Sequence, residues 1–325
     1  MQKIKEFQTI FEKYLSENTF TQSPEELYEP VDYILSLGGK RLRPALVLIG
    51  CHLFRENVIP ALPAAMAIEV FHNFSLVHDD IMDAAPLRRG KPTVHTRYDT
   101  NTAILSGDVM LIYTYNFLAQ LEDQQIVGQV INIFNQVAIK VCEGQQYDMN
   151  FENRQEVTIP EYLKMIELKT AVLIAGSLQI GALIGGASAD DAQHLWEFGR
   201  HIGIAFQLQD DYLDTFGDPA KFGKKVGGDI AQNKKTYLIL KALEIASNEQ
   251  RVQLQHYMAL PESEEAVKIQ KITELLDRLN LPTLIRKKRD AFREKAYQHL
   301  MAVQVPEEAK QILHDMSEKL IQREV

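Results

Sequence analysis

Hydrophobic residues recur three and four positions apart along most of the chain, with no alternation of the kind that β-strands show. Helices are predicted in the long apolar segments 60–83, 100–122, 161–186, 191–214 and 233–246. Several of these are apolar almost all round, as expected of helices at the centre of a bundle. More highly charged outer helices are predicted within 1–18 and 263–323, and proline and glycine separate the segments.

This pattern predicts an all-α protein in which residues 1–325 form a single domain, one large helical bundle. No linker, low-complexity tract or hairpin signal interrupts it. A chain of 325 residues can bury a large core. We find no signal peptide and no continuous apolar run of about 18 residues, which predicts a cytoplasmic protein without a membrane span.

Charge and cysteine content narrow the function classes. The net charge of −9 argues against a nucleic-acid partner, although local basic clusters can still bind anionic ligands. The two cysteines, Cys51 and Cys142, lie far apart and in no metal-ligand spacing. This usage fits a reducing compartment, and both are predicted to be buried and unreactive.

Two aspartate motifs with the same spacing end two of the predicted helices, and they comprise Asp79, Asp80 and Asp83 in "HDDIMD" and Asp210, Asp211 and Asp214 in "QDDYLD". At 100° per residue, the three carboxylates of each motif share one arc of the helix surface. The C-terminal end of a helix carries negative charge, so carboxylates there need a cation nearby. Carboxylate oxygens suit Mg²⁺, and two such clusters facing each other would hold several Mg²⁺ ions bridged by a diphosphate.

Basic residues accompany these motifs. They fall in "GGKRLRP" at 38–44, "PLRRGKP" at 86–92 and "KFGKKVGGDIAQNKK" at 221–235. Arginine matches phosphate oxygens with two donors, and lysine supplies a compact charge. A single acidic motif or basic run is most simply a solvated surface. Two acidic copies in apolar helices, each followed by a basic loop bounded by glycine or proline, favour a shared diphosphate ligand.

Together these segments resemble the trans-isoprenyl diphosphate synthases, the polyprenyl synthetase family. The resemblance extends over residues 38–236 and includes "GQQYD" at 144–148 and "LKTA" at 168–171. It implies helices around a deep central cavity, Mg²⁺ as cofactor with three ions when substrate is bound, and a homodimer. The substrates would be isopentenyl diphosphate and an allylic diphosphate (dimethylallyl, geranyl or farnesyl).

The resemblance also assigns roles to single residues. Asp79, Asp80, Asp83, Asp210 and Asp214 look like the Mg²⁺ carriers, and Asp211 belongs to the same set by spacing. Arg88, Lys169, Lys225 and Lys234 resemble contacts to the allylic diphosphate, and Lys40, Arg43, His72 and Arg89 resemble the isopentenyl diphosphate pocket. Thr170 and Gln207 lie where family members place oxygens near the developing carbocation, and Asp148 lines the same cavity by analogy.

The residues before Asp79 bear on product length. Phe71, Phe74 and Ser75 lie on one stripe of the predicted helix, below the carboxylates. An aromatic residue five positions before the first aspartate, with a small residue at the fourth, resembles enzymes that make C20 geranylgeranyl diphosphate. A C15 farnesyl diphosphate synthase is the close alternative. Phe71 is equally consistent with ordinary core packing.

Three further alternatives remain open. A terpene cyclase shares one aspartate-rich helix and Mg²⁺ but has no use for the second motif, the "GGKRLRP" segment or Arg89. A non-catalytic partner subunit would be expected to have lost aspartates, and all six are present. A purely structural helical protein would bind no diphosphate with Mg²⁺.

Overall fold

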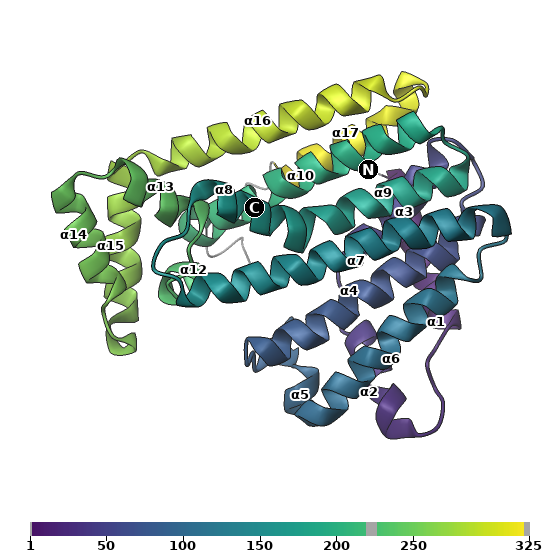
Figure 1. Ribbon diagram of the computed structural model, residues 1–325, viewed down its shortest axis with the longest axis horizontal. Coiled ribbons are helices and arrows are strands. Elements are labelled where there is room, and N and C mark those ends of the chain that lie inside the picture. The colour runs from purple at the N-terminus through teal and green to yellow at the C-terminus, as the bar shows by residue number, and fades with distance from the viewer. Residues whose placement is uncertain (1, 219–225, 322–325) are drawn as a thin grey trace. The chain divides into compact units, whose positions relative to one another are not determined.

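The computed structural model describes residues 2–218 and 226–321, which are almost entirely helical (Figure 1). The first part contains α1 Gln2–Glu17, α2 Glu25–Ser36, α3 Leu42–His52, η1 Ile59–Ala61, α4 Leu62–Met82, α5 Val94–Arg97, α6 Thr100–Leu118 and α7 Gln124–Asn153. The remainder contains α8 Ile159–Ile166, η2 Glu167–Ala171, α9 Val172–Gly185, α10 Ala189–Phe216, α12 Gly228–Ala231, α13 Tyr237–Ile245, α14 Asn248–Met258, η3 Glu262–Glu264, α15 Glu265–Arg278, α16 Leu281–Ala302 and α17 Glu307–Ile321. The predicted all-α class is confirmed.

One short hairpin departs from the prediction. Strands β1 Leu87–Arg88 and β2 Lys91–Pro92 pair antiparallel, with Arg88 opposite Lys91. The described residues contain no other strand. Arg89 and Gly90 turn the chain with positive φ angles of 54° and 74°. The expectation of no hairpin was wrong because strands of two residues are too short to show an alternating pattern.

The described residues group into two compact units. Unit 1 comprises the described part of Met1–Ala138, with Leu173–Trp196 and Ala302–Leu313. Unit 2 comprises Ile139–Val172, Glu197–Met301 and the described part of His314–Val325. The single domain proposed from the sequence stays a prediction.

Unit 1 is organised around buried apolar helices. Every residue from Pro44 to Cys51 on α3 is buried, and α4 packs along α6 (Figure 1). Glycine lets α3 and α9 approach closely, since a Cβ on Gly181 would lie 2.0 Å from the Val47 carbonyl oxygen. Backbone contact at this distance excludes any larger residue.

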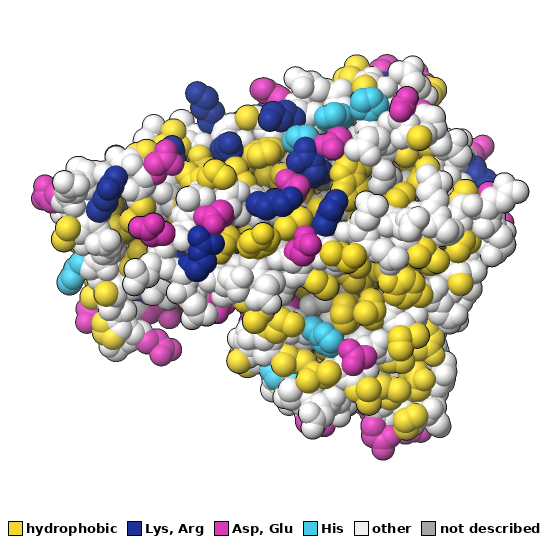
Figure 2. All heavy atoms as spheres, in the orientation of Figure 1, with side chains coloured by type: hydrophobic (Ala, Val, Ile, Leu, Met, Phe, Trp, Pro, Cys, Tyr) yellow, Lys and Arg dark blue, Asp and Glu magenta, His cyan; other side chains and the backbone are white. Residues whose placement is uncertain are grey.

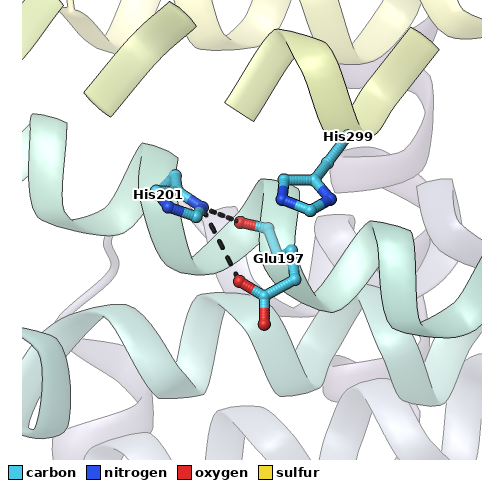
Figure 3. Close-up of side chains that lie close together, drawn as sticks. All are labelled: Glu197, His201 and His299. Carbon is cyan, nitrogen blue, oxygen red and sulfur yellow. Dashed lines mark hydrogen bonds and ion pairs between the residues drawn. The ribbon is translucent and has the colours of Figure 1, made fainter. Parts of the chain in front are cut away.

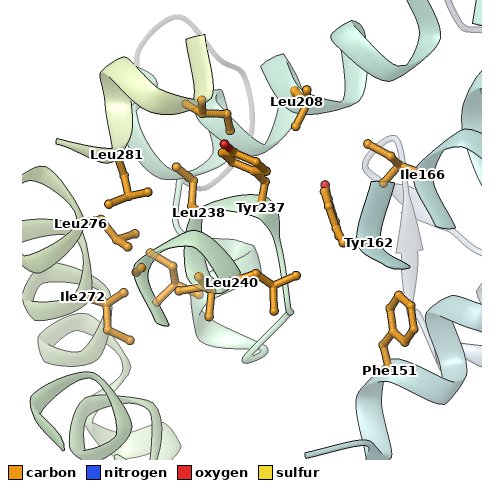
Figure 4. Close-up of a cluster of buried hydrophobic side chains, with 14 of the residues drawn as sticks. Phe151, Tyr162, Ile166, Leu208, Tyr237, Leu238, Leu240, Ile272, Leu276 and Leu281 are labelled. Atoms are coloured by element: carbon orange, nitrogen blue, oxygen red, sulfur yellow. The ribbon is translucent and has the colours of Figure 1, made fainter. Parts of the chain in front are cut away.

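Unit 2 has its own hydrophobic core, to which α7, α8, η2, α10 and α12 to α16 contribute (Figure 4). This core includes two side chains that carry a hydroxyl group, Tyr162 and Tyr237. Leu238 and Leu276 within it are fully buried. Helix α8 begins with a capping box in which Thr158 and Glu161 bond to each other's backbone, with Pro160 in the first turn. The start of this helix is therefore fixed locally, and the core fixes the rest.

Two sequence expectations about composition need adjustment. Cys51 is buried, and burial raises the pKa of its thiol to about 11, but Cys142 is exposed, so the prediction of two buried cysteines was wrong for Cys142. The helical stretch Ile159–Gly185 is long and apolar enough to cross a membrane by composition. Of its most apolar window, 72% is buried inside the protein, and core helices pass the same test.

Candidate active site

The first acidic motif lies at the C-terminal end of α4, where the β1–β2 hairpin folds back on it. Arg88 donates from Nε to Asp80 Oδ2 at 2.7 Å and from Nη2 to Asp80 Oδ1 at 2.6 Å. The Asp79 carboxylate is 3.9 Å from the same Nη2, and Asp83 is exposed at the C-cap. Both oxygens of Asp80, which is 2% exposed, are therefore engaged by Arg88.

The two arginines of the "GGKRLRP" segment, Arg41 and Arg43, have different partners. Arg41, which has a left-handed φ of 44°, turns inward and donates to Glu69 at 2.5 Å and to the Leu35 carbonyl at 2.6 Å. Glu69 also accepts from Asn73 at 3.2 Å. Arg41 is thus a buried support for the segment, and no sequence pattern indicated Glu69 as its partner.

Arg43 faces the other way and meets His72. Arg43 Nη1 lies 3.2 Å from His72 Nε2, and Arg43 Nε is buried without a hydrogen-bond partner among the described residues. Burial lowers the pKa of Arg43 to about 10. Burial, and then the charge of Arg43 and Arg89, holds the pKa of His72 well below its usual range. A cationic group with a spare donor beside a neutral imidazole is a combination suited to an anion.

Arg89 lies close enough to Arg43 and His72 for its charge to act on both. Arg89 Nη1 donates to the Gly38 carbonyl, and a Cβ on Gly39 would lie 3.1 Å from the Arg89 guanidinium. The backbone carbonyl of Lys40 accepts from Gln8 Nε2 at 2.5 Å. Unit 1 therefore brings together Arg43, His72 and Arg89, with Gly39 leaving room for the Arg89 side chain.

A row of aromatic rings continues along α4 from the acidic motif. Phe74 lies against His78 with ring centroids 4.8 Å apart, and Phe71 lies 5.6 Å from Phe74. Phe71 is buried and packs edge-to-face on Phe134 of α7. Ser75 bonds to the His72 carbonyl at 2.8 Å. The predicted stripe of Phe71, Phe74 and Ser75 is present.

The second acidic motif lies near the C-terminal end of α10, in unit 2. Asp211 is 3% exposed, and its Oδ2 accepts from the Tyr162 hydroxyl and from the Tyr237 backbone N–H at 3.4 Å. Burial raises the pKa of Asp211 to about 8, and the hydrogen bond from Tyr162 acts in the opposite direction. These contacts hold Asp211 in the core of unit 2, and its role as a metal ligand stays a prediction.

Asp214 holds the segment that follows α10. Its Oδ2 accepts from the Asp229 N–H at 3.0 Å, and burial with the charge of Asp229 raises its pKa to about 6. Asp229 in turn lies 3.4 Å from Lys234 Nζ. Burial alone would lower the pKa of Lys234. The negative charges of Asp229 and Asp148 have the larger effect, so this pKa is raised. Asp229 was missed by the sequence analysis, although "GGDI" places this acid among lysines.

Each acidic motif thus turns its second aspartate inward. Asp80 binds Arg88 and Asp211 binds Tyr162, while Asp79 and Asp210 are half-buried. Two independent helices therefore engage the second aspartate of their motif with a protein donor. Asp214, at the fifth position of the second motif, accepts from the Asp229 N–H.

Lys169 and Thr170 lie in η2, a π-helical turn between α8 and α9. Lys169 Nζ is 2.7 Å from Asp148 of α7, and Thr170 Oγ1 donates to Gln207 Oε1 at 3.5 Å. Glycine accommodates the turn on two sides. A Cβ on Gly144 would lie 2.2 Å from Lys169 N, and one on Gly203 would lie 2.5 Å from Ala171 Cα. Single π-turns inside α-helices occur frequently at functional sites.

The predicted residues of unit 2 that the structure describes are therefore grouped around η2 and the end of α10. Lys169 pairs with Asp148, Thr170 with Gln207, and Lys234 with Asp229. Lys225 lies outside the described residues.

A third group of potential ligands lies elsewhere in unit 2. Glu197, His201 and His299 each offer a ligand atom within 4.8 Å of the others (Figure 3). Arg200 already binds Glu197 at 2.7 Å and lies 3.2 Å from His201 Nε2. Because this guanidinium supplies the positive charge, the group needs no metal ion to be stable.

We expect Asp211→Asn to keep kcat within about threefold of the parent, because a carboxyl with a pKa of about 8 is already neutral at pH 7 and asparagine preserves its shape. Tyr162→Phe removes the donor and should lower the free energy of unfolding by about 2 kcal/mol. Steady-state kinetics and urea titration test both. A folded Asp211→Asn protein as inactive as Asp210→Asn would contradict this expectation and support Asp211 as a metal ligand.

Comparison with known proteins shows the family of this chain. A model of the family described as polyprenyl synthetase matches residues 24–276. Geranylgeranyl diphosphate synthase of Methanosarcina mazei is 43% identical over 222 residues, which cover 68% of each chain. Geranylfarnesyl diphosphate synthase of Natronomonas pharaonis is 39% identical over 258 residues, covering 74% of this chain and 75% of the relative. A crystal structure of a geranylgeranyl pyrophosphate synthase, 43% identical, superposes with a TM-score of 0.94 over 98% of both chains.

The two acidic motifs, the basic residues around them and the all-α fold thus occur in a chain that the family model matches over most of its length. The chain belongs to the polyprenyl synthetase family, the trans-isoprenyl diphosphate synthases.

Proposed function

We propose that this protein is a short-chain prenyltransferase that joins isopentenyl diphosphate head-to-tail to an allylic diphosphate, with C20 geranylgeranyl diphosphate as its main product. The observation that supports the proposal is the repeated acidic motif at the ends of α4 and α10, in which a protein donor holds the second aspartate of each copy. Farnesyl diphosphate synthesis is the alternative.

The allylic diphosphate would be bound by Asp79, Asp83 and Asp210 through Mg²⁺, with Arg88 and Lys169 as direct contacts. The donor set fits this ion, because Mg²⁺ prefers carboxylate oxygens and keeps positions for phosphate. When bound, Mg²⁺ neutralises the diphosphate as it leaves. Arg88 has a further role supported by its contacts, since it fixes Asp80 and lies within 3.9 Å of Asp79.

Isopentenyl diphosphate would be held by Lys40, Arg43, His72 and Arg89. The buried Arg43 Nε supports this assignment, because a buried donor without a partner is costly unless a ligand satisfies it. His72 is neutral at pH 7 and can donate or accept at the pocket without adding charge. Arg43 and Arg89 supply the positive charge that the diphosphate needs.

The chemistry follows from this division. The basic side chains stabilise negative charge as the allylic C–O bond ionises, which is the main catalytic contribution. Thr170 and Gln207 present oxygens that can stabilise the allylic cation. The double bond of isopentenyl diphosphate then attacks, and the released diphosphate takes up the proton. Apolar side chains on the helices that carry the aspartates exclude water, which would otherwise quench the cation.

Product length would be limited by Phe74, with Ser75 leaving space beside it. Phe74→Ala is expected to lengthen the main product by at least one C5 unit, because removal of the ring opens the path toward Phe71. The product is measured by reversed-phase chromatography after dephosphorylation. Ser75→Ala is the matched control and should leave the length unchanged. The same product length from Phe74→Ala and the parent would remove Phe74 from this role.

The decisive experiment incubates purified protein with Mg²⁺, isopentenyl diphosphate and, separately, dimethylallyl, geranyl and farnesyl diphosphate. We expect C20 product from each, abolished by EDTA and restored by Mg²⁺. Hydrocarbon formed from one allylic substrate alone would indicate a cyclase. Binding of Mg²⁺ and diphosphate without turnover would indicate a non-catalytic subunit, and no binding would indicate a structural protein.

A homodimer is also proposed. Ile104, Leu105, Ile112 and Tyr115 of α6 are 42%, 58%, 67% and 38% exposed. At 100° per residue they share an arc of about 100°, and Figure 2 shows hydrophobic side chains gathered over α6. A second copy would cover this stripe. Light scattering should give twice the chain mass, and Ile112→Asp should give a monomer. The cytoplasmic location stays a prediction.

A further inference from the structure

His78 connects the acidic end of α4 to α6. It immediately precedes Asp79, and its Nε2 lies 3.2 Å from the carbonyl oxygen of Ile104. The imidazole occupies space that Gly107 leaves open. A Cβ on Gly107 would lie 2.2 Å from His78 Nε2 and 2.7 Å from Cδ2. Any side chain at position 107 must therefore displace the His78 ring.

His78 also begins a continuous row of rings. Its imidazole meets Phe74 edge-to-face at 4.8 Å, and Phe74 leads through Phe71 to Phe134. Phe134 meets Tyr115 at 5.5 Å in an edge-to-face contact. Since Gly107 and Tyr115 both belong to α6, this helix fixes both ends of the row. The position of Phe74 thus depends on α6 as well as on its own helix.

We propose that Gly107 is a specificity-determining position of the synthase, because it seats His78 and His78 braces the Phe74 ring that limits product length. The inference rests on the proposed function and extends it from α4 to α6. His78 is a positioning residue here, acting through Phe74. A residue with a side chain at position 107 would favour a shorter product by moving the imidazole away from α6 toward Phe74.

Gly107→Ala should fold. The atoms that its Cβ would meet belong to the end of the His78 side chain, which can turn about its χ angles, and alanine favours a helix by about 1 kcal/mol over glycine. The displaced ring then narrows the space beside Phe74. His78→Ala has the opposite effect, because Phe74 loses its brace and the space widens.

The test compares the products made by the parent, Gly107→Ala, His78→Ala and the double variant from isopentenyl and geranyl diphosphates with Mg²⁺. We expect Gly107→Ala to raise at least tenfold the ratio of the product one C5 unit shorter to the parental product. His78→Ala should increase products longer than the parental one. The double variant should lose the shortening, because the clash is with the ring. Gly128→Ala, a helical glycine with no atom near its Cβ position in the described structure, is the control and should keep the parental product.

Parental product lengths from both Gly107→Ala and His78→Ala would overturn the inference, as would a double variant that still makes the short product. If Gly107→Ala fails to fold, His78→Ala decides alone, and an unchanged product length refutes the bracing role. Failure of the parent to form any prenyl diphosphate would instead refute the proposed function. A lower rate with unchanged product length counts against the inference, because it reports only disturbance near Asp79.

Discussion

Asp79→Asn is expected to lower kcat by about 10³-fold, because the loss of one metal-binding carboxylate removes several kcal/mol of charge stabilisation from the departing diphosphate. The fold should be unaffected, since Asp79 is half-buried and lies 3.9 Å from Arg88. Steady-state kinetics at saturating Mg²⁺ measures the rate. Calorimetry should show weaker binding of inorganic diphosphate in the presence of Mg²⁺.

Asp80→Asn is the matched control, one residue away on the same helix. Its carboxylate makes two hydrogen bonds to Arg88 and is 2% exposed, so the change should lower the free energy of unfolding by about 2 kcal/mol. Asp79→Asn should leave that free energy within about 0.5 kcal/mol of the parent. Equal losses of activity in the two variants, with equal free energies of unfolding, would contradict the assignment of a metal-binding role to Asp79 and a structural role to Asp80.

Much of the fold was predictable because the helices of this chain are long and apolar. The segments 60–83 and 100–122 became α4 and α6, and their period was visible without any tertiary information. The β1–β2 hairpin and the π-helical turn η2 were not predictable in this way. The π-helical turn depends on Gly144 and Gly203, which lie on other helices. The sequence of η2 itself therefore contains no pattern that predicts it.

The candidate site was predictable as a set of residue types but not as a set of roles. The spacing predicted that the three aspartates of each motif share one arc of the helix. It did not predict that Arg88 and Tyr162 would donate to the second aspartate of their motifs. The helical angles did distinguish the second aspartate. Around the helix axis, the first and fifth positions of each motif are 40° apart, and the second position lies at the edge of the arc. Glu69 had no comparable signal, because its partner Arg41 is 28 residues away in sequence.

Gly144→Ala is expected to lower the free energy of unfolding by about 3 kcal/mol and to reduce kcat by about 10²-fold in the protein that remains folded. The added Cβ would lie 2.2 Å from Lys169 N and 2.6 Å from Lys169 Cα. Backbone atoms cannot rotate out of the way as the His78 ring can, so α7 and η2 must separate. The separation moves Lys169 and Thr170, which carry the diphosphate contact and the oxygen near the cation in the proposed mechanism.

Gly128→Ala, on the same helix, isolates this effect. Nothing described lies within 4 Å of its Cβ position, so the change should stabilise the protein by up to about 1 kcal/mol through helix propensity and leave kcat unchanged. Urea titration and kinetics on the two variants separate propensity from packing. Because the η2 backbone is the obstacle, Lys169→Ala should not relieve the loss of stability in Gly144→Ala. Recovery of the parental stability in that double variant would show that the side chain, and not the π-helical backbone, sets the limit.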